Sequence, residues 1–562
     1  MNARLKSAIG TVMVLAVVLA PLIGGEPAGA VTPSQINGSG SSWAENAVDE
    51  WVQNINDEGI KVVYTPDGDA QGRQDFASGT SDFAVTADGY QGFDSTTGQS
   101  DSSSRSYAYL PIAAGGTSFP YQIKFDGQQV ENLRLSGETL AKIFTNQITN
   151  WDNPEITADN NGVQLPSLPI TPVVQSEGSG STEQLTNYFA TQYPSIWKPY
   201  AGQAGPTEYF PRQGNQIAQD GSNGAMNYVT SSEANGSIGY VEYSFALSVN
   251  YPVAKLLNSA GYYTLPTQYN VAVSLEAAQI NTDQNPADCA SLGYSTSPCY
   301  LLQKLNGVYT DPDPRTYPLS SYVYMIEPTS GTDSKMTDGK WQALADFAYY
   351  SICQGQKQIG PIGYSPLPVN LVEAGFGQIN QLQTADPSIS LANENIDTCN
   401  NPTFVLGQPN TNYLATIAPL PPACDKQGAG PCVAGVTPNG IGITATVSGT
   451  YPGTASSSQA GTTTTTAPTA SGGASTSATT AAAGAASAGT AASSGASSAS
   501  GASGSGVSDA AVKPPPYASA ALAEYDSSSP WGPIVAVLLL LALATPFLVG
   551  YLRSRRRREG RQ

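Results

Sequence analysis

The chain has no histidine among its 562 residues. A Ser-His-Asp or Cys-His nucleophile and a histidine general base are therefore excluded. A zinc or copper site is disfavoured as well, because imidazole is a preferred ligand of both metals. We therefore expect a protein that is not an enzyme and that holds no metal and no cofactor.

Charged residues are also scarce, and basic residues are scarcer than acidic ones. Only 12% of the residues are charged, with 24 lysines and arginines against 43 acidic residues, so the formal net charge is −19. Because a nucleic-acid-binding protein needs a basic surface, we expect no nucleic acid partner. An anionic ligand remains compatible with this composition, since helix N-termini and neutral donors can hold an anion.

Cysteine is also sparse, and none of the six cysteines forms a C-x-x-C motif. That spacing argues against a redox or zinc role. An even number of cysteines in an exported chain indicates disulfide bonds. The simplest of the possible connectivities joins neighbours in the sequence: Cys289 to Cys299, Cys353 to Cys399, and Cys424 to Cys432.

The N-terminal residues 1–30 have the pattern of a signal peptide. Arg4 and Lys6 form a basic start, an apolar run follows, and Ala28 to Ala30 form a small-residue cleavage site. No cysteine follows the apolar run, so we expect no N-terminal lipid anchor. The folded part is therefore predicted to be exported.

The C-terminal part predicts a membrane anchor. Residues 446–530 are rich in Ser, Thr, Ala and Gly, a composition that cannot form a core and predicts a disordered stalk. Residues 531–552 form an apolar segment long enough for one transmembrane helix. The arginine-rich tail, residues 553–562, is then expected in the cytoplasm by the positive-inside rule. These features predict a single-pass cell-membrane protein whose folded domain is extracellular.

Between these ends, residues 31–445 alternate strand-like and helix-like patterns, which is typical of an α/β fold. Strands are predicted at residues 61–65, 82–86, 107–114, 170–174, 238–241 and 322–326, and helices begin near residues 43, 70, 136, 182 and 341. The Tyr-, Pro- and Asn-rich residues 250–314 have no clear pattern.

Glycine-serine loops lead directly into predicted helices at several places. In the first, Ser42 and Glu45 have the spacing of a capping box, and in the second Ser181 and Gln184 repeat it. Residues 221–227 offer a third such loop. A single capped helix start is commonplace, but repeated hydroxyl-rich starts suggest a shared anion site, because first-turn amides can point at an anion.

These segments resemble the phosphate-binding proteins of ABC transporters. The resemblance rests on the order and spacing of five segments between about residue 36 and residue 380: residues 36–43, 82–85, 151–152, 177–181 and 236–243. It implies a two-lobed periplasmic-binding-protein (type II) fold with a ligand cleft between the lobes. On this basis lobe I comprises residues 31–112 and 318–445, and lobe II residues 113–317, with hinges near Pro111–Ile112 and Pro318–Leu319.

The resemblance also implies ligand-binding residues. The family's first-loop contacts fall on Ser42 and the backbone of Trp43, and its Ser-Gly-Thr/Ser turn falls on Ser179, Gly180 and Ser181. These positions carry the matching residue types. They predict hydroxyl and amide donors for the oxygens of phosphate or a similar oxyanion.

Three other positions depart from the family pattern. A serine of the family falls on Asp69, its acceptor aspartate falls on Ala87, and its arginine falls on Gln175. A carboxylate acceptor is important because it accepts a hydrogen bond from the P–OH group of phosphate and disfavours sulfate, which has no such proton. Either Asp69 has become the acceptor, with Arg73 or Arg212 supplying positive charge, or the pocket has changed its ligand or decayed.

The sequence therefore predicts a membrane-anchored solute-binding protein that captures phosphate for an ABC permease. One alternative is a surface interaction module with an altered pocket, which the changes at Asp69, Ala87 and Gln175 favour. Another is a phosphatase-like enzyme on the same fold, which the lack of histidine disfavours. The predicted ligand-binding set is Ser42, Trp43, Asp69, Arg73, Ser179, Gly180 and Ser181.

Overall fold

The computed structural model describes residues 31–432, apart from short gaps at 94–95, 285–288, 393, 406–407 and 409–410. The chain divides into two compact units, Met1–Ser458 and Gln459–Gln562, and all described residues belong to the first. The predicted signal peptide, stalk, transmembrane segment and basic tail lie outside the described residues. Within the described part, no helix has the length and apolar character needed to cross a membrane.

The first unit is built on a six-stranded sheet with the order β13-β6-β18-β3-β1-β2. β1, β2 and β3 are parallel, whereas β18 runs antiparallel to both β3 and β6. The strands are β1 (Ile36–Gly40), β2 (Val62–Thr65), β3 (Phe83–Thr86), β6 (Tyr107–Ser118), β13 (Val241–Glu242) and β18 (Ser320–Pro328). β3, β6 and β18 are buried along their whole length, as strands covered on both faces must be.

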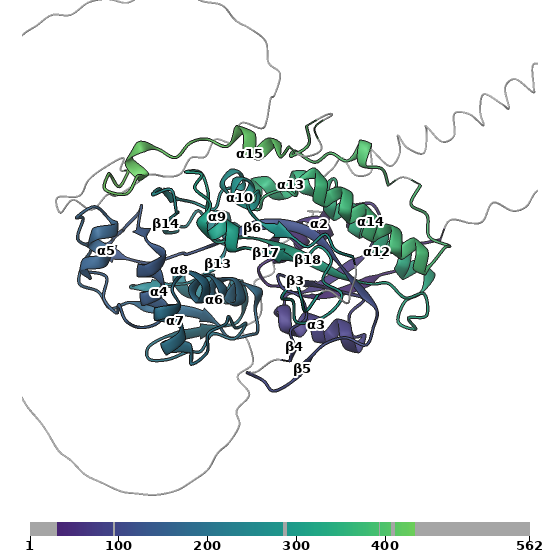
Figure 1. Ribbon diagram of the computed structural model, residues 1–562, viewed down its shortest axis with the longest axis horizontal. Coiled ribbons are helices and arrows are strands. Elements are labelled where there is room, and N and C mark those ends of the chain that lie inside the picture. Colours follow the sequence, from purple (N-terminus) through teal and green to yellow (C-terminus); the bar gives the residue numbers. More distant parts are fainter. Residues whose placement is uncertain are drawn as a thin grey trace, which may run out of the picture. The chain divides into compact units, whose positions relative to one another are not determined.

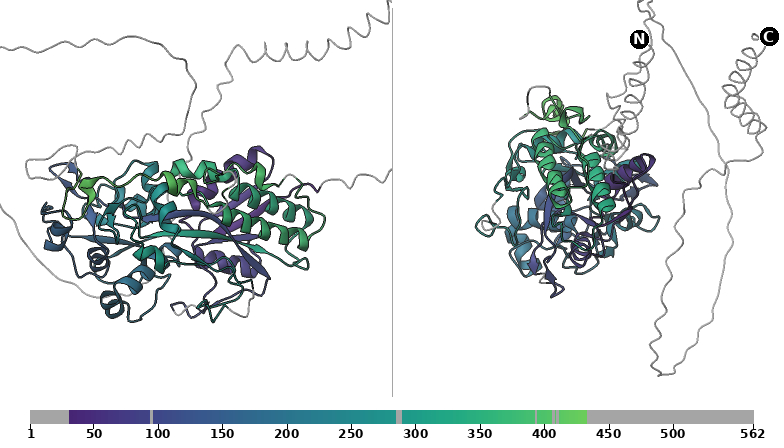
Figure 2. Two further views of the ribbon diagram at one scale, coloured as in Figure 1. Left: turned by 45° about the horizontal axis from the view of Figure 1, so that its top comes forward. Right: turned by 90° about the vertical axis from the view of Figure 1, so that its right-hand side faces the viewer.

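Helices cover both faces of this sheet. Because β1 lies between β2 and β3, the two right-handed crossovers place α2 (Glu45–Asp57) and α3 (Asp69–Ser78) on opposite faces. Figure 1 shows α12 and α14 above the sheet and α3 below it, and α12 packs against α14 (Figures 1 and 2). The remaining helices of this region are α12 (Asp338–Ile352), α13 (Gly355–Ile362) and α14 (Val369–Ala385).

A second, three-stranded parallel sheet has the order β11-β10-β12. Its strands are β10 (Thr171–Gln175), β11 (Ile217–Gln219) and β12 (Ser237–Ile238), and its helices are α4 (Gly137–Phe144), α5 (Pro154–Asp159), α6 (Gly180–Gln192), α7 (Pro194–Ala201) and α8 (Gly221–Thr230). We call residues 34–118 and 320–385 the large-sheet lobe and residues 122–238 the small-sheet lobe. The predicted α/β class is thus confirmed.

The two lobes are joined where the long strand β6 ends. β6 pairs with β18 from Tyr107 to Gly116, so Pro111 and Ile112 lie inside the sheet, beside an irregularity in the pairing between Val323 and Tyr324. The chain leaves the large sheet after Ser118 and reaches β12 through a bridge between Tyr121 and Ile238. The predicted hinge positions and domain limits stay predictions.

Residues 243–310 carry short elements. They are α9 (Tyr243–Ser248), β14 (Lys255–Leu257), β15 (Tyr263–Thr264), α10 (Gln268–Leu275), β16 (Gln279–Ile280), β17 (Gln303–Lys304) and α11 (Asn306–Thr310). β14 pairs with β15 and with β9 (Arg134–Leu135). Four further two-residue strands form hairpins: β4 (Gly92–Phe93), β5 (Ser100–Asp101), β7 (Lys124–Phe125) and β8 (Gln128–Gln129).

The three predicted disulfide bonds are confirmed: Cys289–Cys299, Cys353–Cys399 and Cys424–Cys432. Two of them hold the C-terminal segment, residues 386–432, which contains η3 (Ile396–Thr398), α15 (Tyr413–Ile417) and η4 (Ala423–Asp425). In Figure 1 this yellow-green segment runs along the top of the unit from α14 towards α5, and α15 packs on α10.

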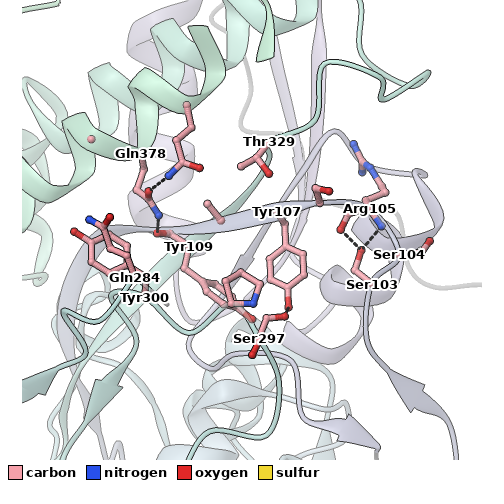
Figure 3. Close-up of a pocket in the computed structure, with 15 residues that line it drawn as sticks. Ser103, Ser104, Arg105, Tyr107, Tyr109, Gln284, Ser297, Tyr300, Thr329 and Gln378 are labelled. Atoms are coloured by element: carbon pink, nitrogen blue, oxygen red, sulfur yellow. Dashed lines mark hydrogen bonds between the residues drawn. The ribbon is translucent and has the colours of Figure 1, made fainter. Parts of the chain in front are cut away.

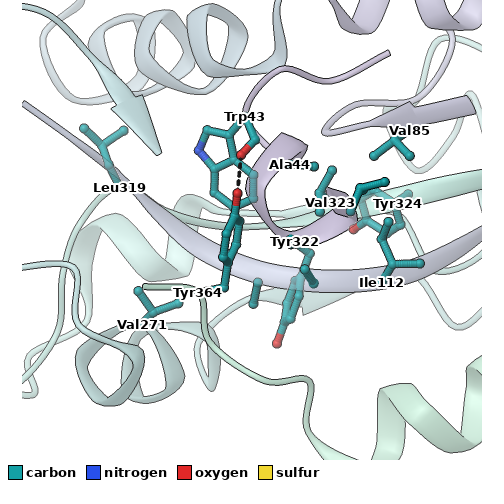
Figure 4. Packing of buried hydrophobic residues seen from close by; sticks show 14 of the residues in the cluster. Trp43, Ala44, Val85, Ile112, Val271, Leu319, Tyr322, Val323, Tyr324 and Tyr364 are labelled. Atoms are coloured by element: carbon teal, nitrogen blue, oxygen red, sulfur yellow. Dashed lines mark hydrogen bonds between the residues drawn. The ribbon is translucent and has the colours of Figure 1, made fainter. Parts of the chain in front are cut away.

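The core reaches directly under the first glycine-serine loop. Trp43 is 2% exposed, and its carbonyl accepts a hydrogen bond of 2.7 Å from the Tyr364 hydroxyl (Figure 4). Its indole N–H donates to Thr117, and a Cβ on Gly115 would come within 2.7 Å of its ring. The start of α2 is therefore held rigidly against β6, which fixes the loop that precedes it.

Candidate functional site

The loop before α2 meets α8 across the gap between the lobes. The Ser42 hydroxyl accepts a hydrogen bond of 3.1 Å from the Ser222 amide and lies 3.3 Å from the Ser222 hydroxyl. The predicted capping box was wrong, because the N-cap position of α2 is Ala44 and has no side-chain cap. The Glu45 carboxylate instead accepts from the Asn223 side chain, so both members of the expected box bind the other lobe.

The start of α6 lies opposite the start of α3. Here the N-cap is Ser179, whose hydroxyl accepts from the Thr182 amide, so the predicted cap at Ser181 was also wrong. The Ser181 hydroxyl is buried and makes no hydrogen bond within the described residues. Its neighbour Gly180 touches the other lobe, since a Cβ there would lie 2.4 Å from the Ala87 Cβ and 2.6 Å from the Asp69 carboxylate.

Asp69 is fully buried at the first position of α3. Its Oδ1 accepts a hydrogen bond of 2.6 Å from the Ala87 amide, while its Oδ2 has no partner among the described residues. Burial raises the pKa of this carboxyl, and the amides of Gly180 and Ala87 partly offset that effect. The Asp69 carboxyl thus lies beside Ala87, the residue on which the aspartate of the resembled family falls.

Arg73 lies one turn further along α3 and is also fully buried. Its guanidinium donates to Asp101 at 3.0 and 3.1 Å, to the Thr86 hydroxyl at 3.1 Å and to Glu208 at 2.7 Å. Because Glu208 belongs to the small-sheet lobe, this is a buried ion pair between the lobes. Arg73 neutralises these two carboxylates, and its predicted contact with a ligand stays a prediction.

Gln175 and Glu177 complete the small-sheet side. Gln175 ends β10 and places its Nε2 3.4 Å from the Ser222 hydroxyl, while its Oε1 has no partner in the described part of the chain. Glu177 accepts from the Gly221 amide at 3.0 Å, and burial raises its pKa to about 7. The structure therefore brings Ser42, Asp69, Ser179, Gly180 and Ser181 to one place between three helix starts.

Two contributors to this region were missed from the sequence. Ser222 lies in the third glycine-serine loop predicted from the sequence, but nothing in the sequence indicates that this residue contacts Ser42. Glu208 lies in a loop without periodicity and carries no sequence signal, although it binds Arg73 and its carbonyl accepts from the Ser179 amide. Arg212, the other cation considered, is exposed.

Two cavities lie near these elements. One, of about 330 Å³, adjoins the site between the lobes and is lined by Ala87, Asp88, Glu183, Gln184, Lys304 and Tyr324 among others. A larger one, of about 810 Å³, lies beside the start of β6 and is lined by Arg105, Tyr107, Tyr109, Tyr300 and Gln378 (Figure 3). None of the predicted ligand-binding residues lines either cavity.

Among the described residues, no group of three or more His, Cys, Asp or Glu side chains is placed to hold a metal ion. The groups that the site offers are hydroxyls, amides and the carboxyls of Asp69 and Glu177. Such a set can hold an oxyanion without forming covalent bonds.

Comparison with known proteins gives the family of the chain. Residues 26–354 match the model of the PBP superfamily domain. The phosphate-binding protein PstS of Xylella fastidiosa is 28% identical over 340 residues, which cover 60% of this chain and 83% of the relative. Phosphate-binding protein PstS 2 of Mycobacterium tuberculosis is 28% identical over 341 residues, covering 59% of this chain and 83% of the relative.

PstS of Methanocaldococcus jannaschii is 25% identical over 394 residues, covering 67% of this chain and 95% of the relative. These relatives bear the name of binding proteins, not of enzymes, which supports the expectation that the chain is not an enzyme. Since the family model spans more than half of the sequence, the chain belongs to the PBP superfamily.

Proposed function

We propose that this protein captures inorganic phosphate and delivers it to an ABC permease. The observation that carries the proposal is a set of buried, unsatisfied polar atoms between the lobes. They are the Ser181 hydroxyl, Asp69 Oδ2 and Gln175 Oε1, none of which has a hydrogen-bond partner among the described residues, while the Ser41 hydroxyl lies beside the Asp69 carboxyl and stabilises its charged form. Buried polar groups are normally satisfied, so their clustering here indicates a ligand that supplies both acceptors and a donor.

Protonated phosphate supplies both. Its unprotonated oxygens accept from the serine hydroxyls and from the first-turn amides of α6, and its P–OH group donates to Asp69 Oδ2. Sulfate lacks that proton and would place an acceptor against Asp69. An ionised Asp69 repels either anion by about 4 kcal/mol per unit charge at a separation of about 4 Å and an effective dielectric constant of about 20, but only phosphate offsets this cost with a hydrogen bond from its P–OH group.

The proposal includes the location of the protein. The signal peptide, stalk, transmembrane helix and basic tail expected from the sequence make it a cell-membrane protein with its binding domain outside. The membrane anchor then keeps the binding domain close to the permease, and the stalk sets its reach.

The test is calorimetric titration of the full-length chain, stripped of bound ligand, with phosphate and with sulfate. We expect micromolar or tighter binding of phosphate and no response to sulfate. Asp69→Ala should reduce this discrimination, whereas Asp338→Ala, an exposed aspartate in the first turn of α12, should leave it unchanged. The absence of heat with either ion, from a folded sample, would rule out phosphate capture.

One observation favours a second candidate, a surface interaction module without a ligand. The Asp69 carboxyl already accepts from the Ala87 amide and lies close to the Gly180 amide, so it occupies part of the space around the start of α6. The same titration decides between the two, because a site filled by its own carboxylate would bind neither ion.

A further inference from the structure

The C-terminal segment contains a short proline-rich stretch, residues 418–422 (Ala-Pro-Leu-Pro-Pro), which we call the rod. The rod begins where α15 ends and stops where η4 begins. Ala418 and Pro422, at its two ends, have φ angles of −55° and −57° and ψ angles of 125° and 146°. These angles are close to those of a polyproline II helix, so the rod is extended.

The stiffness of the rod comes from its sequence and not from packing. Leu420 is 74% exposed, and Pro419 and Pro422 are exposed as well. Each residue of the rod either is a proline, whose ring fixes φ, or precedes a proline and is restricted to extended conformations. The rod is therefore a semi-rigid spacer of about 15 Å, at about 3.1 Å per residue.

The first end of the rod is attached to the strands of the large sheet. α15 packs on α10 through a buried apolar cluster, and α10 packs on both β6 and β18. The Arg315 guanidinium also donates to the Ala415 carbonyl of α15 at 2.8 Å. Upstream of α15, Cys399 is bonded to Cys353 at the end of α12. The start of the rod therefore moves with the large-sheet lobe.

The second end of the rod is attached to the small-sheet lobe. The buried Arg134 guanidinium donates to the carbonyls of Cys424 and Ala429 at 3.2 and 2.8 Å. The Asn161 side chain donates to the Gly430 carbonyl at 2.9 Å. Figure 1 shows the C-terminal segment reaching from α14 towards α5. The rod therefore spans the distance between one attachment on each lobe.

The rod and the candidate site lie on opposite sides of β6. A Cβ on Gly115 would come within 2.7 Å of the Trp43 ring, and a Cβ on Gly116 would come within 2.4 Å of Pro266. Successive residues of a strand face opposite sides of its sheet. Trp43 follows the first glycine-serine loop of the site, whereas Pro266 directly precedes α10, on which α15 packs.

The lobes are closed in this structure, since Ser42 is hydrogen-bonded to Ser222 and Arg73 is paired with Glu208 across the gap. If the lobes separate at the site by rotating about the strands that join them, parts on the opposite side of those strands approach each other. The two ends of the rod lie on that opposite side. A stiff spacer resists their approach and therefore resists the opening.

We propose that the rod is a strut that holds the lobes closed and slows the release of the ligand. This inference rests on the proposed function, because release of a bound anion requires the lobes to open. It assigns to the C-terminal segment a role that contacts within the site do not supply. A flexible connection of the same length would leave the lobes free to open.

The test measures the distance between the lobes in the full-length chain without ligand, by pulsed electron spin resonance. The spin labels are placed on Glu58→Cys of the large-sheet lobe and Lys198→Cys of the small-sheet lobe, both exposed. The variant combines Pro419→Gly, Pro421→Gly and Pro422→Gly, which remove the stiffness and keep the attachments at both ends. We expect the ratio of long to short inter-label distances to rise at least about threefold.

Pro387→Gly is the matched control, because Pro387 is exposed in the same segment but lies upstream of the attachment at Cys399. An unchanged distance distribution in the rod variant would overturn the strut, and so would an equal shift in the control. A shift to shorter distances would overturn it too, since the rod would then hold the lobes apart. The rate of phosphate dissociation should rise by the same factor as the distance ratio. Because the distances are measured without ligand, failure to bind phosphate would refute phosphate capture and leave the result for the strut intact.

Discussion

At the scale of single residues, the carboxyl of Asp69 decides which anion the site accepts. Its raised pKa means that its charge changes at a higher pH than that of an ordinary aspartate. When ionised it accepts the proton of phosphate and repels sulfate, and when protonated it can donate to either anion. The selectivity of the site should therefore depend on pH.

We expect the sulfate affinity to rise as the pH falls through the pKa of Asp69, so that the ratio of phosphate to sulfate affinity shrinks. Titrations with both ions at a series of pH values between 5 and 8 would measure this ratio. Asp69→Asn, which cannot ionise, should show a small ratio that no longer depends on pH. If the ratio of phosphate to sulfate affinity did not change with pH in the protein without substitutions, ionisation of Asp69 would not determine the selectivity.

Arg73 is the second decisive residue, because its buried guanidinium joins the lobes through Glu208. Arg73→Met leaves Asp101 and Glu208 buried without their cation, which should cost about 3–5 kcal/mol of the free energy of unfolding. Lys142→Met is the control, since Lys142 pairs with Glu138 and Glu155, whose side chains are 58% and 47% exposed, and these surface pairs should be worth less than about 1 kcal/mol. Urea unfolding of both variants would show the difference, and equal losses would contradict it.

At the scale of elements, the C-terminal segment links the two lobes a further time. It begins after α14 of the large-sheet lobe, where Cys399 is bonded to Cys353. It ends near the small-sheet lobe, where the Arg134 guanidinium donates to the Ala429 carbonyl at 2.8 Å and Lys255 pairs with Asp425 at 2.7 Å. Cys353–Cys399 attaches the start of the segment to the end of α12, whereas Cys424–Cys432 closes a loop within its other end.

These two disulfides should differ in their effect on stability. Cys353–Cys399 closes a loop with a sequence separation of 46, and Cys424–Cys432 one with a separation of 8. The loss of chain entropy in the unfolded state predicts stabilisation by about 4 kcal/mol for the first and about 2.5 kcal/mol for the second. Paired Cys→Ser variants of each bond, compared by urea unfolding, would test this order, and a larger loss for the shorter loop would reverse it.

At the scale of the whole molecule, the unusual property is the number of buried acids with raised pKa values. Burial raises the pKa of Glu177 to about 7 and those of Glu183, Glu242 and Glu327 to about 8. The folded protein therefore keeps protons that the unfolded chain releases near pH 4.5. Unfolding releases these protons between about pH 4.5 and 8, so a rise in pH favours the unfolded state.

We expect the melting temperature, measured in phosphate-free buffer, to be highest near pH 5, to fall up to about pH 8 and to level off above it. Glu327→Gln should flatten this decline, because neither oxygen of Glu327 has a hydrogen-bond partner among the described residues. The exposed Glu373→Gln should leave the profile unchanged. A melting temperature that rises between pH 5 and pH 8 would show that these carboxyls are not protonated in the folded state.

Much of the fold could be read from the sequence, because it depends on local pattern and composition. The strands near Val62, Phe83 and Tyr322 and the α/β alternation follow from hydrophobic periodicity. The disulfide pairing followed from the simplest connectivity. The helix starts were predicted to within a few residues, but α2 has no side-chain cap at all, and α6 is capped by Ser179 and not by Ser181.

The sequence by itself determined the chemical inventory: no imidazole, few cations, and hydroxyl-rich loops before helices that suit an oxyanion. Only the tertiary structure decided how that inventory is used. In the folded chain Ser42 is hydrogen-bonded to Ser222, which is 180 residues away. The Asp69 carboxyl accepts from the Ala87 amide, and Arg73 pairs with Glu208 of the other lobe. The physical reason is that capping and periodicity act within a few residues, whereas these contacts depend on how two separate sheets pack against each other.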